Sequence, residues 1–120
     1  MVAISPEAFN NFIAGDDDVA VVMLNLIRFQ PDGGRSRYLE YIKMAESILE
    51  RFGARILFCG DGLPVLTAEQ TQAWDAVTLV RYPRRSAFKA MVGDPEYQIA
   101  FEVGASAIAE IVLQPFKNAI

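Results

Sequence analysis

The chain has 120 residues, the size of one small domain, and we expect residues 1–120 to form a single unit. Its net charge of −4 argues against a nucleic-acid partner, because a nucleic-acid-binding surface needs a basic face. The sequence contains no histidine, which removes the most common metal ligand and the most common general base near neutral pH. It also lacks a phosphate-binding glycine loop and a CxxC pair, so we expect no metal and no cofactor.

Hydrophobicity bears on location and assembly. The longest apolar run, Val19–Ile27, is interrupted by Asn25 and is too short for a membrane helix, which takes ~20 residues. The N-terminal residues lack the pattern of a signal peptide, and the single cysteine, Cys59, is compatible with a reducing compartment. We therefore expect a cytoplasmic protein without a membrane partner. Because 52% hydrophobic residues is high for so small a chain, part of the apolar surface is expected to meet a second subunit.

The first elements have clear start and stop signals. Ser5-Pro6-Glu7 has the form of an N-cap followed by proline, which predicts a short helix that Gly15 ends. Val19–Phe29 is rich in aliphatic and β-branched residues and predicts a long strand. From Ser36 to Phe52 the apolar residues recur at helical spacing, which predicts a long helix.

The remaining elements follow from the same signals. They are a strand at Ala54–Cys59 with further pairing at Val65-Leu66, a strand at Asp75–Tyr82, a helix at Ser86–Val92, a helix that starts at Asp94-Pro95, and a strand at Ile108–Pro115. Apart from the extra N-terminal helix, the order is βαββαβ. Two split βαβ units of this kind form a four-stranded antiparallel α+β sheet with helices on one face and the first and third strands at its centre.

Alternation divides the central strands into two apolar faces. One face is aliphatic, with charges such as Arg28 at its rim; the other carries Asn25 and Thr78 among aromatic residues that include Trp74. If Arg28 lies opposite Asp75, then Asn25 lies opposite Thr78. Because the helices cover only one face, we expect a second copy to cover the other and form a homodimer.

Asn25 is the most unusual residue, an amide in the middle of an aliphatic strand. A buried amide without a partner costs ~1–3 kcal/mol, so Asn25 is expected either to bond to Thr78 or a nearby backbone group, or to face a ligand. These two readings have about equal weight. In the ligand-facing reading, Asn25 polarises or orients a substrate in a pocket that mixes apolar and polar groups.

Other polar residues are candidates for the same pocket. Asp75 is expected to pair with Arg28, and a general-base role is its less favoured alternative. Trp74 is expected to be a packing anchor more often than a ligand platform. The candidate substrate-binding residues are Arg28, Tyr38, Tyr41, Trp74, Thr78 and Tyr97, and Asn25 and Asp75 are the candidate catalytic residues.

Several of these segments occur together in a known family. Met23–Phe29 (MLNLIRF), Tyr38–Tyr41, Trp74-Asp75, Arg81–Pro83 and Met91–Tyr97 (MVGDPEY) resemble the domain-of-unknown-function 1330 family. The resemblance runs from about Val19 to Phe116 and implies a ferredoxin-like fold of the dimeric α+β barrel superfamily. Where such sequences typically have serine after Tyr-Pro, this one has Arg84.

The superfamily includes cofactor-free monooxygenases, lactone isomerases, haem-degrading enzymes and haem peroxidases, all with a cleft between sheet and helices. The absence of histidine disfavours the haem-binding members. The resemblance leaves three functions open: an enzyme acting on a small apolar or aromatic molecule, a non-catalytic binder of such a molecule, or an interaction domain with a filled core.

Overall fold

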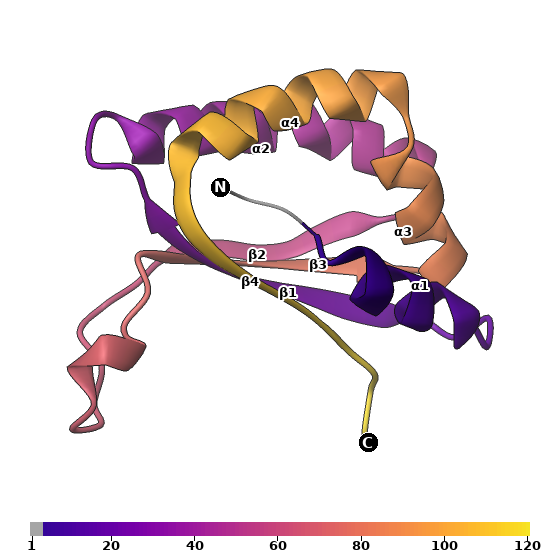
Figure 1. Cartoon of the computed structure of the whole chain (residues 1–120), viewed down its shortest axis with the longest axis horizontal. Helices are drawn as coiled ribbons and strands as arrows, with labels where there is room; N and C mark the ends of the chain where they lie inside the picture. The colour runs from indigo at the N-terminus through magenta and orange to yellow at the C-terminus, as the bar shows by residue number, and fades with distance from the viewer. Residues whose placement is uncertain (1–3) are drawn as a thin grey trace.

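The computed structural model describes residues 4–120 and has the predicted sheet (Figure 1). Its strands are β1 (Val21–Phe29), β2 (Arg55–Asp61), β3 (Ala76–Tyr82) and β4 (Ile108–Phe116), in the order β2-β3-β1-β4. All neighbouring strands are antiparallel, and β1 and β3 lie at the centre. The ferredoxin-like α+β fold is therefore confirmed.

The helices lie on one side of this sheet (Figure 1). The long helices α2 (Gly34–Arg51) and α4 (Pro95–Ala107) pack against each other above it, and α3 (Arg85–Val92) and α1 (Pro6–Ala14) lie toward one end. The predicted caps are present, because Ser5 Oγ accepts a hydrogen bond from Ala8 N and the Asp94 carboxylate accepts one from Tyr97 N. Arg84 precedes α3 without a side-chain cap bond.

The pairing of the central strands confirms the predicted register. Asn25 is directly opposite Thr78, with Met23 opposite Val80 on the same face. These residues point toward the helices, so the mixed face is the covered one. The aliphatic face of the sheet is left open in the single chain.

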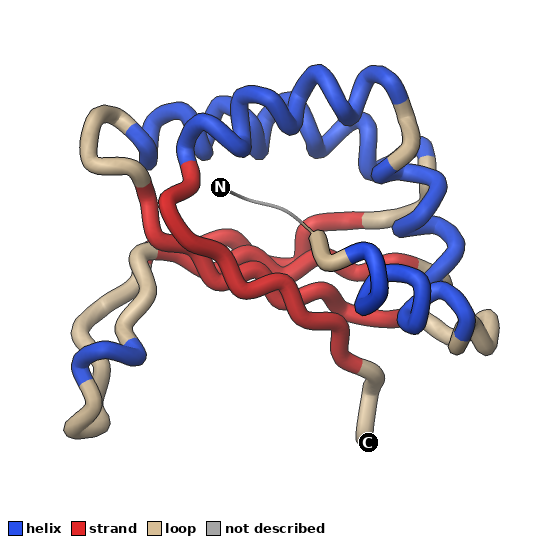
Figure 2. The backbone as a smooth tube through the Cα atoms, viewed as in Figure 1, coloured by secondary structure: helices blue, strands red, loops and turns tan. Residues whose placement is uncertain are grey.

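One prediction about the segment between β2 and β3 is wrong. Val65-Leu66 does not pair; it belongs to a long loop that contains only a 3₁₀ turn, Gln70–Gln72. This loop, residues 62–75, projects beyond the sheet on the side away from the helices and is called the β2–β3 arm below (Figure 2). Since Pro64 and the following polar residues offer no alternating pattern, nothing holds the segment against a neighbouring strand.

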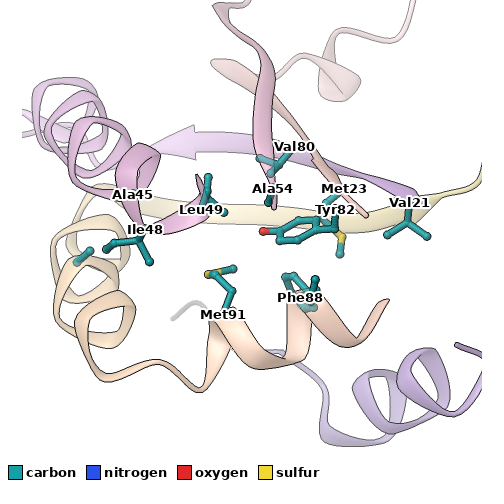
Figure 3. Packing of buried hydrophobic residues seen from close by; sticks show 12 residues of the cluster. Val21, Met23, Ala45, Ile48, Leu49, Ala54, Val80, Tyr82, Phe88 and Met91 are labelled. Atoms are coloured by element: carbon teal, nitrogen blue, oxygen red, sulfur yellow. The ribbon is translucent and has the colours of Figure 1, made fainter. Parts of the chain in front are cut away.

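The buried residues form two clusters between the sheet and the helices. The larger one lies toward α3 and includes Val21, Met23, Leu49, Phe88 and Met91 (Figure 3). The smaller one, at the other end of β1, joins Ile27, Tyr38, Ala107 and Ile108. Within residues 4–120, no helix has the length and apolarity that a membrane crossing requires.

Candidate functional site: a cavity lined by tyrosines

A cavity of about 570 Å³ lies between the sheet and the helices, and members of both buried clusters line it. This volume is within the range of small-molecule sites. Within the described part of the chain, the lining contains no charged side chain; it is aliphatic and aromatic with a few neutral polar groups. The cavity argues against the alternative of an interaction domain whose core is filled by side chains.

Asn25 lines the cavity from the middle of β1. Its Nδ2 donates to the backbone oxygens of Met23 (3.3 Å) and Thr78 (3.2 Å). Because both partners only accept, the orientation of the amide is fixed, and Oδ1 has no donor among residues 4–120. The two expectations for Asn25 therefore combine: one end bonds to backbone, and the other is available to a ligand.

Thr78 and Tyr38 form a hydrogen-bonded chain across the cavity wall. Tyr38, from α2, and Thr78, from β3, place their hydroxyl oxygens 2.5 Å apart. Thr78 Oγ1 in turn lies 3.5 Å from Cys59 Sγ, to which it donates a weak bond. Both hydroxyl protons thus have an acceptor within the protein.

A second pair joins the two long helices. The hydroxyls of Tyr41 on α2 and Tyr97 on α4 lie 2.7 Å apart, and the ring of Phe101 stacks on that of Tyr97. Each phenol has one O–H proton, and the hydrogen bond between the two hydroxyls uses only one of these protons. The other proton has no acceptor in residues 4–120.

Tyr82 was expected on the mixed face but was not among the candidate site residues. It is 3% exposed and lines the cavity, and its hydroxyl makes no hydrogen bond to the described residues. Figure 3 shows the hydroxyl oxygen directed away from Phe88, toward Leu49 and Met91. The available signal was parity, because Thr78, Val80 and Tyr82 alternate onto one face of β3.

Burial sets the electrostatics of these phenols. Desolvation raises the pKa of Tyr41 well above its usual range, and it raises the pKa values of Tyr38, Tyr82 and Tyr97 as well. The bond to Thr78 opposes this effect at Tyr38 without reversing it. At neutral pH, all four phenols of the chain are therefore uncharged hydrogen-bonding groups.

Three candidate residues lie outside the cavity lining. Arg28 does not pair with Asp75; it forms an ion pair with Glu110 at 2.7 Å. The Asp75 carboxylate instead accepts the backbone N–H of Phe29 at 2.8 Å. The Asp75 backbone does continue the strand, because its N–H donates to Ile27 O and its oxygen accepts from Gly62 N. The ion-pair prediction is wrong because the two side chains take other partners, Glu110 and the arm backbone for Arg28 and the Phe29 N–H for Asp75.

Trp74 was expected on the mixed face, and this is also wrong. Its ring lies under the guanidinium of Arg28, 4.0 Å from ring centroid to Cζ. Arg28 also donates to the backbone oxygens of Ala73 and Thr71. Arg28 and Trp74 thus fix the base of the β2–β3 arm.

The arrangement can hold an uncharged molecule and donate hydrogen bonds to it. In the part of the chain that the structure describes, no carboxylate or amine lines the cavity to transfer a proton, and burial raises the pKa of its phenols. Among residues 4–120, no group of three or more Cys, Asp or Glu side chains is arranged to hold a metal ion. Any reaction here would depend on positioning and on neutral donors.

Comparison with known proteins places the chain by sequence and by fold. The sequence model described as "Domain of unknown function (DUF1330)" matches residues 33–113. No curated protein matches the chain. The solved structure of RPA0582, a protein of unknown function from Rhodopseudomonas palustris, has 28% identity and a TM-score of 0.88, covering 99% of this chain and 97% of that one.

More distant structures share the fold alone. A dimeric ferredoxin-like protein of unknown function from Jannaschia sp. CCS1 has 15% identity and a TM-score of 0.62, covering 82% of this chain and 99% of that one. SnoaB, a cofactor-independent oxygenase from Streptomyces nogalater, has 11% identity and a TM-score of 0.61, with 85% and 95% covered.

Proposed function

The chain belongs to the DUF1330 family, and we propose that it binds a small, largely apolar or aromatic molecule in the cavity between the sheet and the helices. The observation that carries this proposal is the cavity itself, which holds neutral polar groups at separate points of an apolar wall. A space of about 570 Å³ with a largely apolar wall has the size and character of a small-molecule site, which supports a ligand-binding role.

Asn25 and the tyrosines support the same proposal. Asn25 occupies a position where an aliphatic residue would pack without unpaired polar atoms, yet its Oδ1 remains available. The aromatic walls, made by Tyr38, Tyr41, Tyr97 and Phe101, suit an aromatic ligand that packs edge-to-face or in offset stacks.

If the molecule is turned over, a cofactor-free oxygenation or isomerisation fits best. Desolvation, positioning and donors such as the Tyr41–Tyr97 pair are the means the cavity provides. The fold similarity to SnoaB, a cofactor-independent oxygenase, agrees with this candidate. A non-catalytic binder is the second candidate, because the described cavity wall contains no group suited to proton abstraction.

The open face of the sheet supports a homodimer. Leu24, Leu26 and Leu79 are half-exposed at its centre, and Phe58 at its edge is 55% exposed. A contiguous apolar face of this kind is covered in stable proteins, and the fold's dimeric representative from Jannaschia agrees with a second copy as the cover.

The binding proposal is tested by extracting the purified protein and identifying bound small molecules by mass spectrometry. The same extraction is done on Ala45→Leu, which adds three carbons inside the cavity, and on Ala90→Leu, which adds them on the exposed side of α3. We expect the ligand to be lost from the first variant and kept by the second. Equal retention by both would contradict the proposal.

Turnover and assembly have their own tests. Once a ligand is identified, its conversion by the wild type and by Asn25→Ala separates the enzyme from the binder, and equal turnover would remove Asn25 as a catalytic residue. Light scattering gives the oligomeric state, and Leu24→Asp on the open face should produce a folded monomer. A wild-type monomer at micromolar concentration would contradict the dimer.

A further inference from the structure

The hydrogen-bonding groups of the cavity differ in whether their capacity is already used. With Thr78 Oγ1 donating to Cys59 Sγ, the Tyr38 hydroxyl donates to Thr78 Oγ1. Neither of these two hydroxyls then has an O–H left to donate to a ligand. Tyr82 has its entire hydroxyl unused within residues 4–120, and the Tyr41–Tyr97 pair has one unused proton. The O–H groups that remain available to a ligand are therefore that of Tyr82 and one from the Tyr41–Tyr97 pair.

Tyr82 and Tyr97 both line the cavity. An ionised Tyr97 would raise the pKa of the Tyr82 phenol through charge repulsion. Burial dominates that pKa shift, so Tyr82 remains a neutral donor. The Tyr82 hydroxyl faces the cavity, where an acceptor on a ligand would satisfy it.

The cavity also presents an acceptor. Asn25 Oδ1 accepts no hydrogen bond from residues 4–120, and the two Nδ2 bonds to backbone oxygens fix the orientation of the amide. No charged side chain of residues 4–120 lines the cavity, so an ionised ligand would lose its hydration without gaining a counter-ion. The wall therefore selects against carboxylates, phosphates and ammonium groups.

We propose that the ligand of this cavity is an uncharged aromatic compound with an oxygen acceptor, such as a ketone, which takes the O–H groups of Tyr82 and the Tyr41–Tyr97 pair. A hydroxyl on the same compound would donate to Asn25 Oδ1. This inference rests on the proposed function and gives the cavity a ligand class defined by charge and hydrogen bonding.

The test uses three probes of nearly one shape: 2-acetylnaphthalene, which has a ketone; 2-ethylnaphthalene, which lacks it; and 2-naphthoate, which is anionic at neutral pH. Binding is measured by fluorescence at pH 7. We expect the ketone to bind about 3–10-fold more tightly than the hydrocarbon, which corresponds to one neutral hydrogen bond. The ketone should exceed the naphthoate by at least ~30-fold, because the anion is desolvated without a partner.

Conservative variants assign the donor. Tyr82→Phe should remove most of the preference for the ketone over the hydrocarbon while leaving hydrocarbon binding unchanged. Tyr38→Phe is the matched control, because its hydroxyl is already committed to Thr78, and it should keep the preference. A circular-dichroism spectrum confirms that each variant is folded.

The outcomes separate this inference from the function on which it rests. If the ketone and the hydrocarbon are both displaced by the Ala45→Leu substitution but naphthoate binds equally well, the cavity binds ligands and the charge selectivity is wrong. If Tyr38→Phe and Tyr82→Phe reduce the ketone preference equally, the assignment of the free donor is wrong. If none of the three probes binds the wild type, the proposed function itself fails.

Discussion

Raising the pH is the most direct perturbation of the tyrosine cavity, because all four tyrosines of the chain line it. In the unfolded chain each phenol ionises near pH 10. Burial raises the pKa of Tyr38, Tyr41, Tyr82 and Tyr97 in the folded protein, so these groups keep their protons when the unfolded chain loses them. The folded state then binds more protons than the unfolded state, and the free energy of unfolding must fall as the pH rises above 10.

The magnitude follows from the same linkage. At pH 11, one phenol that ionises only in the unfolded chain lowers the free energy of unfolding by about 1.4 kcal/mol. Four such phenols together lower it by about 6 kcal/mol, which is comparable to the whole stability of a small domain. Below about pH 9 the contribution of the tyrosines vanishes, because both states are fully protonated.

Two measurements check this expectation at one fixed protein concentration. Urea unfolding followed by circular dichroism at pH 9, 10 and 11 gives the loss of stability, and absorbance at 295 nm counts the ionised phenols. We expect no tyrosinate in the folded protein and the appearance of all four phenolates together with unfolding. Tyr82→Phe should reduce the loss at pH 11 by about 1.4 kcal/mol, because it removes one titrating group.

The reasoning is refuted if tyrosinate absorbance appears near pH 10 while circular dichroism shows an intact fold. In that case the phenols are in contact with water and the cavity is open to solvent at the tyrosine side. A loss of stability that Tyr82→Phe leaves unchanged would also refute it, since another group would then carry the pH dependence.

Further predictions concern the frame around the cavity. Met91→Ala should lower the free energy of unfolding by about 2–5 kcal/mol in urea, because Met91 is 1% exposed and its loss enlarges the cavity. Gly62→Ala should cost about 1–3 kcal/mol in the same assay, because an added Cβ would lie 2.1 Å from the backbone oxygen of Trp74. Arg28→Met should increase proteolytic cleavage within residues 62–75 several-fold, because Arg28 holds the β2–β3 arm through the backbone oxygens of Thr71 and Ala73. Ligand binding should be unchanged, since Arg28 does not line the cavity. Altered ligand binding would show that Arg28 belongs to the binding site.

The sheet could be predicted because its signals are local and agree with one another. The aliphatic run of β1 and the alternation in β3 determine which residues share a face, and a one-residue slip would expose the whole apolar set. That constraint places Asn25 and Thr78 on one face, whereas their direct opposition followed from an assumed register, which the structure confirms. The caps at Ser5 and Asp94 were equally predictable, since each depends on three or four consecutive residues.

The candidate site was predictable only where these rules apply. Tyr38 and Tyr41 lie on the inward stripe of α2, and Thr78 lies within β3, so periodicity brings them to the cavity. Trp74 and Asp75 stand at the start of β3, where alternation can assign a face at most and does not determine which partner a side chain takes. Their positions depend on contacts with Arg28 and Phe29, which are 45 or more residues away in the chain.

The cavity itself has no sequence signal, because it is a volume that side chains fail to fill. Tyr82 illustrates this: its hydrophobic face packs against Phe88 at 5.2 Å between ring centroids, as a core residue would. Only the hydroxyl of Tyr82, which has no partner among residues 4–120, indicates a further role. Whether that hydroxyl finds a partner depends on the complete fold and cannot be predicted from the sequence.

The two faces of β1 explain how one small sheet can serve both parts of the proposed function. Met23, Asn25 and Ile27 point to the cavity, and Leu24 and Leu26, which alternate with them, point to the open face. The cavity wall and the proposed dimer surface therefore share a backbone but no side chain. A cover on the open face would lie against the outer side of the same strands, whose β1–β3 pairing runs beneath Asn25. The fixed orientation of the Asn25 amide depends on that backbone, because its two acceptors are the oxygens of Met23 and Thr78. A second copy on the open face would thus support the ligand-facing group from behind, without contributing a residue to the cavity.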